Sequence, residues 1–396
     1  MMMSETLQEF VLDERCPALA PDRFRDVYRR VAVKLEATDF SGADPFDGLN
    51  SRLFAKLPLS SLPIMRLAWL QLFKNSPYNF RPLAKVPPST NPVTLALAAR
   101  TYARLSDNAK MRHAVERLLE LRCDPVRWGY GAWGYPFPWQ AKAFYVPRGV
   151  PNVIATAYAV RAVSECGPSV ADNVIFGAAA LVGKELARRR GDSASYIGYV
   201  PESGTMVHNA NVWGAYVLAL AATRGNREWR PLADAAIDYT LRAQTPEGSW
   251  PYGESSHHRW TDGFHTGYVL EALQLCRSLL KRHDLAEPIA RGTEYYLRTF
   301  LRNDGVVPYY ADGSGPLDAN NFAQMIITLE CVRPTLDWTA LAERTLMSAI
   351  KELWCPDLDA FAYQRRGRRI NRISYIRWTQ IWMMHALGIL LTQREG

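Results

Sequence analysis

Apolar and polar positions divide much of the chain into two kinds of segment, and both have the spacing of helices. Segments of the first kind open with polar residues and continue as apolar stretches rich in Ala and Leu. They begin at positions 94, 152, 209, 262, 318 and 376, so the steps between them are 58, 57, 53, 56 and 58 residues. A repeat of this length predicts stacked supersecondary units.

The polar openings have the residue types that begin helices. Asn152, Asn209, Asp262 and Asp318 stand at four of them, and Asn and Asp are favoured N-cap residues. Segments of the second kind lie between the apolar ones, start near 231, 289 and 341, and are charged on one face only. The apolar helices are therefore expected to form an inner ring and the amphipathic ones an outer ring.

Six such pairs predict an all-α (α/α)6 toroid. The outer partner of the first inner helix is expected at SLPIMRLAWLQLF, from residue 61. Residues 61–396 would then form a single toroid domain, and residues 1–60 an N-terminal extension packed on it. The loops that lead into the inner helices would all emerge at one end of the ring and converge on one mouth.

Composition and charge narrow the function classes. Of 396 residues, 48% are hydrophobic and 22% charged, as in a globular protein. The net charge of +8 is too diffuse to indicate nucleic acid. No apolar run approaches the roughly 18 residues of a membrane span, and the acidic N-terminus lacks an apolar signal segment, so a cytoplasmic protein is expected. No two of the six cysteines lie within four residues, so there is no CxxC zinc or redox motif. No metal triad of recognisable spacing appears either, and neither a metal site nor a cofactor is expected.

One loop before an inner helix is unusually aromatic. Between Trp128 and Tyr145 it carries six aromatic residues, with Trp133, Trp139 and Gln140 among its candidates for ligand contact. Aromatic faces pack well on the C–H faces of sugar rings, so this loop favours a carbohydrate cleft. The alternative is a loop packed on itself at the rim.

The stretch QTPEGSWPYGESSHHRWTDGFHTG, residues 244–267, combines acids, histidines and aromatics. Its first part resembles the QW motif of toroidal cyclases and is expected to be structural, with Gly248 turning and Trp250 packing back. Asp262 and His265 are one helical turn apart and can share a face. Asp262 is then either a plain N-cap or a cap that also faces a ligand.

The whole chain also resembles a known family. PFDGLNSRLF near 45, WGYPFPWQ at 133, VHNANVWGA at 207, RWTDGFHTG at 259 and YIRWTQIW at 375 are similar, in the same order, to segments of the VpsJ-like polysaccharide-biosynthesis proteins. The resemblance implies a role in bacterial exopolysaccharide or capsule synthesis. The HNAN and DNFHTG-type segments of that family correspond in this sequence to His208, Asn209, Asn211, Asp262 and His265. A PLD-type turn expected before HNAN is replaced here by Pro201 and Glu202.

These observations favour an enzyme that acts on a glycan, with hydrolysis ahead of elimination and epimerisation. Hydrolysis needs two carboxylates, for which Glu254 and Asp262 are favoured, whereas the proton-transfer reactions would use His208 and His265. A non-catalytic protein that binds a glycan or lipid-linked sugar is the alternative, and a terpenoid cyclase would need a DxDD motif that is missing. The expected partner is an oligo- or polysaccharide, with anionic and lipid-linked forms included.

The candidate residues follow from these loops. The catalytic candidates are Glu254, Asp262, His208 and His265. The substrate-binding candidates are Trp133, Trp139, Gln140, Asn152, Asn209, Asn211, Tyr252, Trp260, Tyr310, Asp318, Asn321, Arg372 and Arg377. The two arginines belong to a loop with six arginines in 13 residues, which is either a solvated basic turn or a site for carboxylate or phosphate.

Overall fold

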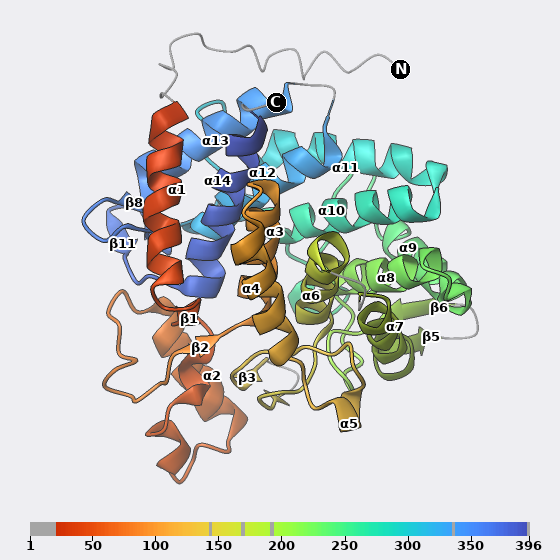
Figure 1. Cartoon of the computed structure of the whole chain (residues 1–396), viewed down its shortest axis with the longest axis horizontal. Helices are drawn as coiled ribbons and strands as arrows, with labels where there is room; N and C mark the ends of the chain where they lie inside the picture. The colour runs from red at the N-terminus through yellow and green to blue at the C-terminus, as the bar shows by residue number, and fades with distance from the viewer. Residues whose placement is uncertain (1–20, 142–144, 168–170, 191–193, 335–336, 394–396) are drawn as a thin grey trace.

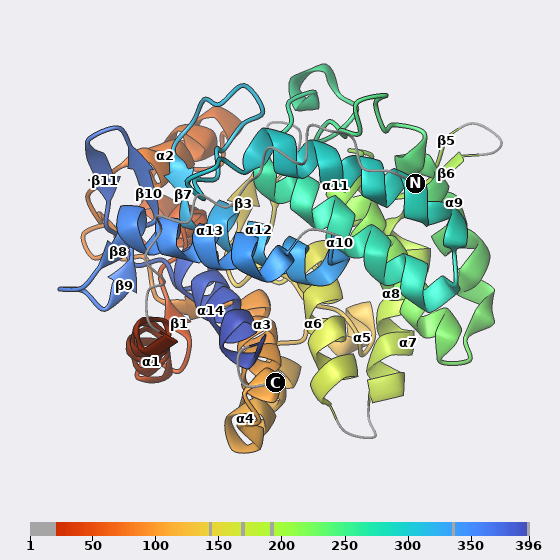
Figure 2. The same ribbon diagram turned by 90° about the horizontal axis from the view of Figure 1, so that it is seen from above.

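The computed structural model describes residues 21–141, 145–167, 171–190, 194–334 and 337–393. Six inner helices form a closed ring, in which each packs on the next and the last, α14, packs on the first, α3 (Figures 1 and 2). The inner helices are α3 (Pro92–Arg104), α6 (Val153–Cys166), α8 (His208–Thr223), α10 (Gly263–Leu280), α12 (Ala319–Val332) and α14 (Ile381–Gln393). The predicted (α/α)6 toroid is confirmed.

Each inner helix has an outer partner. The outer helices are α1 (Pro21–Glu36), α4 (Asn108–Glu120), α7 (Ala171–Leu181), α9 (Arg230–Leu241), α11 (Ala286–Phe300) and α13 (Trp338–Leu353). The prediction that the segment from residue 61 is an outer helix of the ring was wrong. α2 (Pro63–Asn75) packs mainly on a neighbouring short turn and hairpin, whereas α1 packs on α14 and completes the outer ring.

The helix starts show why the repeats were visible. The side chains of Asn91, Asn152, Asp262 and Asp318 each accept a hydrogen bond from a backbone N–H in the first turn of the following inner helix. Asn209 is not a cap, because α8 already begins at His208. All these N-termini meet at one end of the ring.

Residues 41–90 form a lobe beside the ring. It holds β1 (Ser41–Gly42) paired with β2 (Ser89–Thr90), the 3-10 turns η2 (Asp47–Asn50) and η3 (Phe54–Lys56), and the helix α2 (Figure 1). The short helix α5 (Pro125–Trp128) is not part of the lobe, and its Trp128 packs near Leu181 of α7. The buried ion pair of Arg377 with Asp44 holds the lobe to the segment before α14, and a second buried pair, Arg81–Asp47 (2.7 Å), lies within the lobe. Arg81 also donates to the hydroxyl of Tyr375 at 3.2 Å.

Short hairpins occupy the loops before the inner helices. They are β3 (Trp139–Gln140) with β4 (Tyr145–Val146), β5 (Ala187–Arg190) with β6 (Ala194–Ile197), β8 (Trp354–Cys355) with β9 (Ala360–Phe361), and β7 (Leu317–Asp318) with β10 (Gln364–Arg366) and β11 (Arg369–Asn371). Two single-turn π-helices adjoin the longer helices: η4 (Val182–Leu186) follows α7, and η8 (Ile376–Gln380) precedes α14. The remaining elements are the 3-10 turns η5 (Arg227–Trp229), η6 (Ser256–His258) and η7 (His283–Leu285).

The turn that follows α9 is structural, as predicted. Trp250 is buried and its Nε1–H donates to the carbonyl of Thr240 at 3.1 Å. Its ring fills the space against Gly292 of α11, where a Cβ would lie 2.6 Å from the indole. Gly248 adopts a φ of 100°, which favours glycine.

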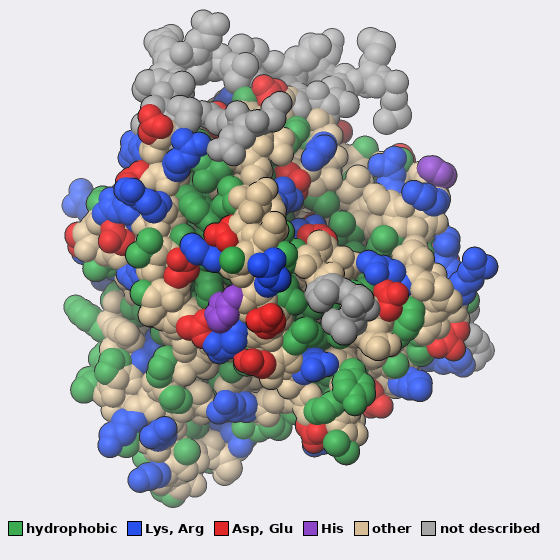
Figure 3. Space-filling model, viewed as in Figure 1, with side chains coloured by type: hydrophobic (Ala, Val, Ile, Leu, Met, Phe, Trp, Pro, Cys, Tyr) green, Lys and Arg blue, Asp and Glu red, His purple; other side chains and the backbone are tan. Residues whose placement is uncertain are grey.

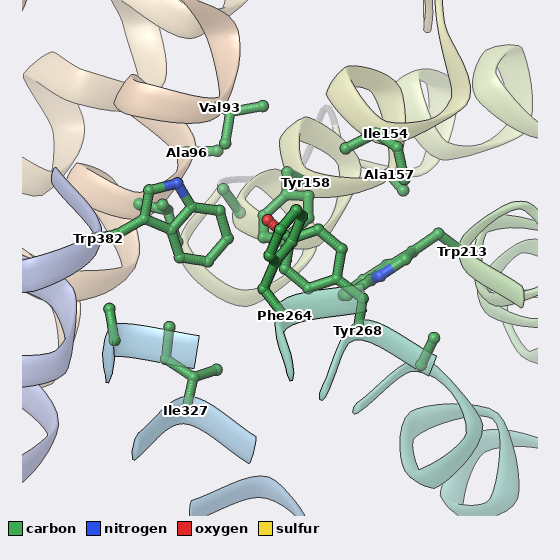
Figure 4. Packing of buried hydrophobic residues seen from close by; sticks show 14 of the residues in the cluster. Val93, Ala96, Ile154, Ala157, Tyr158, Trp213, Phe264, Tyr268, Ile327 and Trp382 are labelled. Carbon is green, nitrogen blue, oxygen red and sulfur yellow. The ribbon is translucent and has the colours of Figure 1, made fainter. Parts of the chain in front are cut away.

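Two buried layers close the ring behind its mouth. In the first, Tyr158, Trp213, Tyr268 and Trp382 meet at the ring axis from four inner helices (Figure 4), with Tyr268 stacked on Trp382 at 5.7 Å between ring centroids. One turn further along α6 and α10 lies the second, the buried ion pair of Arg161 and Glu271. In the described part of the chain, these two layers therefore block the ring axis behind the end where the inner helices begin.

No described helix combines the length and apolar character needed to cross a bilayer.

Candidate functional site

The mouth of the ring contains a cavity of about 320 Å³, lined by residues from the ring and from the lobe. Most of its lining side chains are aromatic. The aromatic residues are Phe46, Tyr135, Phe137, Trp139, Tyr199, Tyr252, Trp260, Phe264, Tyr268, Tyr309, Tyr310, Tyr363, Trp378 and Trp382. A concave, largely aromatic cavity with few polar groups is the usual form of a small-molecule site.

Asp262 and His265 form a hydrogen-bonded pair at the cavity wall. Asp262 is buried, and its Oδ1 accepts the backbone N–H of His265 while its Oδ2 lies 2.7 Å from Nδ1 of the same histidine. A carboxylate at Nδ1 places the proton on that nitrogen and leaves the lone pair on Nε2. Within the described part of the chain, no hydrogen bond occupies Nε2.

Aromatic rings hold the imidazole of His265 in place. Its ring centroid lies 4.4 Å from that of Tyr252 and 5.5 Å from that of Trp260, and Tyr252 and Trp260 are stacked on each other. The side chain remains 18% exposed, so the imidazole reaches the cavity. This geometry presents an oriented imidazole nitrogen to a bound ligand.

Two cations reach the cavity from the side of the lobe. Arg377 makes two hydrogen bonds to Asp44, one of them 2.9 Å long, so its charge is balanced. Lys74, at the end of α2, forms no ion pair with any described carboxylate. Burial lowers the pKa of Lys74, while the charges of Asp318 and Asp262 oppose this shift. Lys74 is therefore a cation of the cavity without a direct ion-pair partner among the described residues.

Asp318 lies behind the cavity wall and is saturated by donors. Its Oδ1 accepts the backbone N–H of Asn320 at 2.8 Å and its Oδ2 accepts Nε2–H of Gln364 at 2.6 Å. Burial raises the pKa of Asp318 to about 6, against the hydrogen bonds from Gln364 and Asn320. The residue caps α12 and adds negative potential near Lys74 without lining the cavity.

A second, much smaller hollow lies behind His265. Its walls include His208, Asn209, Asp262 and His265, and its volume of about 10 Å³ is close to that of one water probe. Burial lowers the pKa of His208 to about 4, so this imidazole is neutral. Nε2 of His208 and Oδ1 of Asn209 are buried and have no hydrogen-bond partner among the described residues. Asn209 lines both cavities and can turn this oxygen toward a ligand.

The structure brings seven of the sequence candidates into the central cavity. They are Trp139, Asn209, Tyr252, Trp260, His265, Tyr310 and Arg377. Three more candidates lie directly behind the cavity wall: His208, Asp262 and Asp318. Asp262 orients His265, and the charge of Asp318 acts on Lys74.

Other candidates have structural surroundings outside the lining. Trp133 is fully buried and donates to the carbonyl of Leu118. Asn152 caps α6, and Asn321 donates to the carbonyl of Pro308. Asn211 bonds Ile197, Ala236 and Thr240, and Gln140 lies in β3.

Two charged candidates lie away from the cavity. Glu254 borders a separate shallow hollow, where it pairs with Arg190 and accepts the Tyr239 hydroxyl at 2.7 Å. Arg372 is exposed and pairs with Asp357. The pair of carboxylates expected from the sequence is therefore not assembled in the cavity, because Glu254 is outside it and Asp262 is behind His265.

The sequence reasoning missed the contribution of the lobe. Phe46 and Lys74 line the cavity although they come from outside the repeats. The PFDG segment containing Phe46 did supply a signal, since it is one of the segments on which the expected resemblance to the VpsJ-like proteins was based. Lys74 had no such signal. Within the described chain, no group of three or more His, Cys, Asp or Glu side chains is placed to hold a metal ion.

Comparison with known proteins gives a fold but no family. No family model and no curated protein matches the sequence. A possible member of the GH105 family from Salmonella enterica subsp. enterica serovar Paratyphi A aligns with a TM-score of 0.59 at 12% identity, over 96% of this chain and 96% of that chain.

Two further solved structures are similar in the same way. The cellobiose 2-epimerase of Bacillus thermoamylovorans aligns with a TM-score of 0.56 at 12% identity, over 77% of this chain and 88% of that chain. An unsaturated glucuronyl hydrolase specific for heparin aligns with a TM-score of 0.51 at 12% identity, over 77% and 85%. At these identities the likeness establishes the toroid fold, while function has to be argued from the site.

Proposed function

We propose that the chain is an enzyme that acts on a glycan, and that His265 transfers the proton in its reaction. The observation that carries the proposal is the Asp262–His265 pair, which presents Nε2 to an aromatic cavity. The aromatic walls suit the C–H faces of a sugar ring. The unpartnered oxygen of Asn209 suits a sugar hydroxyl, because a hydroxyl is a donor.

The charge of the cavity supports an anionic sugar as the substrate. Lys74 enters a lining without Asp or Glu, and Arg377 adds a second, balanced cation. A carboxylate on the sugar would neutralise Lys74 in surroundings of low dielectric, where the attraction is strong. A uronate is therefore the proposed residue at this position.

Hydrolysis is the first reaction to test. Two of the structural neighbours are named as a glucuronyl hydrolase and a possible GH105 member, which agrees with the order of reactions expected from the sequence. In this cavity His265, protonated and paired with Asp262, would donate a proton to the oxygen of the leaving group. This role replaces the two-carboxylate arrangement, because Glu254 does not line the cavity.

Proton removal from carbon is the alternative, and one specific observation favours it. The proton on Nδ1 of His265 leaves a lone pair on Nε2, which is the state needed to abstract a proton beside a carbonyl or carboxylate. Lys74 would stabilise the negative charge that develops there. Epimerisation and elimination share this first step, and another structural neighbour is a cellobiose 2-epimerase.

The cellular role proposed here is exopolysaccharide or capsule synthesis in the cytoplasm, on the strength of the resemblance to the VpsJ-like proteins. The test is mass spectrometry of uronate-containing oligosaccharides after incubation in deuterated water with the protein or with H265Q. Fragments that have gained water indicate hydrolysis, unsaturated fragments indicate elimination, and deuterium at a sugar carbon without cleavage indicates epimerisation. Binding without any of these changes would replace the enzyme with a glycan-binding protein.

A further inference from the structure

The lobe carries a charge pattern found nowhere else in the chain. No Asp or Glu occurs between Asp47 and Asp107, a stretch of 59 residues. Arg81 and Lys74 in this stretch are used inside the protein, but Arg52, Lys56 and Lys85 are exposed. Residues 48–90 therefore contribute basic but no acidic side chains to the surface of the lobe.

The same segment exposes large apolar side chains. Eight of the fifteen exposed large hydrophobic residues described in the structure lie between residues 53 and 83: Leu53, Leu57, Leu59, Leu62, Ile64, Leu72, Tyr78 and Leu83. Three of them, Ile64, Tyr78 and Leu83, are more than 70% exposed, at 73%, 73% and 75%. Such a concentration on one segment marks an interaction surface, since scattered exposed leucines would be ordinary.

These apolar residues are not required for the packing of the lobe itself. The lobe has its own small core, formed by Leu49, Phe54 and Leu70 with Met65 and Trp69 packed on it. The lobe projects from the ring at the lower left of Figure 1, and the corresponding part of Figure 3 shows hydrophobic and basic side chains together. The apolar residues thus lie on the outside of a projection that is already packed within.

We propose that residues 51–85 dock the protein on an anionic lipid bilayer. Leu59, Leu62 and Ile64, around the start of α2, would enter the boundary between headgroups and acyl chains. Arg52, Lys56 and Lys85 would lie at the anionic headgroups, and residues 48–90 of the lobe supply no carboxylate to oppose them. A soluble anionic polymer would account for the basic residues but not for the exposed leucines.

The segment proposed to dock belongs to the lobe that also lines the cavity. Phe46 and Lys74 belong to the same lobe and line the mouth of the ring. Docking would therefore hold the mouth near the bilayer, where a sugar attached to a lipid is located. The proposal itself does not depend on the reaction in the cavity, because it rests on the outer face alone.

Vesicle co-sedimentation of the full chain tests the proposal. Vesicles of phosphatidylcholine mixed with phosphatidylglycerol should bind the protein, and vesicles of phosphatidylcholine alone should bind it at least about ten-fold less. The double variants L59E/I64E and K56E/K85E should each lose about ten-fold in binding to the mixed vesicles. V33E, which alters an exposed apolar residue of α1, should bind like the unaltered protein.

Three results would overturn the proposal. The first is no binding of the unaltered protein to mixed vesicles, and the second is equal binding by L59E/I64E when its thermal melt shows that it is folded. The third is a dimer, seen by sedimentation velocity without lipid, that L59E/I64E dissociates. That result would assign the surface to contact between two copies of the chain.

Discussion

The carboxylate of Asp262 holds His265 at two points, accepting its backbone N–H and its Nδ1–H, each at 2.7 Å. One side chain thus begins α10 and sets the tautomer of the imidazole at the cavity wall. The position and the protonation of the proposed base therefore depend on the same side chain. A substitution that keeps the N-cap but removes the negative charge can separate the two roles.

Replacing Asp262 by Asn should separate the cap from the tautomer. Asn is as good an N-cap as Asp, so the free energy of unfolding should change by less than about 1 kcal/mol. The amide carries no negative charge to stabilise an imidazolium, so kcat should fall by about a hundred-fold or more. D337N, which alters the cap of the outer helix α13, is the matched control and should leave kcat unchanged. Equal activity of D262N and the unaltered protein would show that Asp262 is only a cap.

Replacing Lys74 by Met should distinguish anionic from neutral sugars. The change keeps much of the apolar stem and removes the positive charge, so KM for a uronate substrate should rise by about ten-fold or more. KM for the matching neutral sugar should be nearly unchanged. K56M alters an exposed lysine of the same lobe, and it should affect neither value. A parallel rise for both sugars in K74M would indicate a packing role instead.

His208 should make stability depend on pH. Its pKa is about 4 in the folded protein, below the ordinary value of 6.5, because of burial. The unfolded chain therefore binds the proton more tightly, and stability is lost as pH falls from about 6.5 to about 4, by about 3 kcal/mol in total. Denaturant unfolding across this range should show a flatter pH profile for H208N. H283N, which alters an exposed histidine, should keep the original slope.

The contact between Asp44 and Arg377 should behave as a buried ion pair. D44N leaves the Arg377 charge uncompensated inside the protein, which should cost about 3–5 kcal/mol of unfolding free energy. The double variant D44N/R377M should recover part of this loss, because no buried charge remains. D357N, at the exposed pair with Arg372, should cost less than about 1 kcal/mol. Additive losses in D44N and R377M would contradict the pairing.

The ring was predictable because its signal is periodic and local. The polar caps at Asn152, Asp262 and Asp318 recur at a nearly fixed spacing before apolar helices, and the structure places them as expected. The outer helix α1 was missed because ring closure pairs it with α14, far away in sequence. Its buried residues Phe24, Val27, Val31 and Leu35 have helical spacing that would have identified it, but not its partner.

The site was less predictable, because distances across a ring do not appear in the sequence. Asp262 and His265 were recognisable as a pair, since three residues of helix separate them. Glu254 stood in the same loop, yet the turn after Tyr252 directs it to Arg190 on the outside. Lys74 reaches the cavity from the lobe, which the buried ion pair of Asp44 with Arg377 joins to the segment before α14, and nothing in its neighbouring residues shows this.

The most direct measurement is the single-turnover rate of H265Q on a uronate oligosaccharide, with binding of the same sugar measured by calorimetry. We predict that H265Q binds the sugar within about three-fold of the unaltered protein and reacts at least about a hundred-fold more slowly. Unchanged turnover in H265Q would contradict the account, because another group would then transfer the proton.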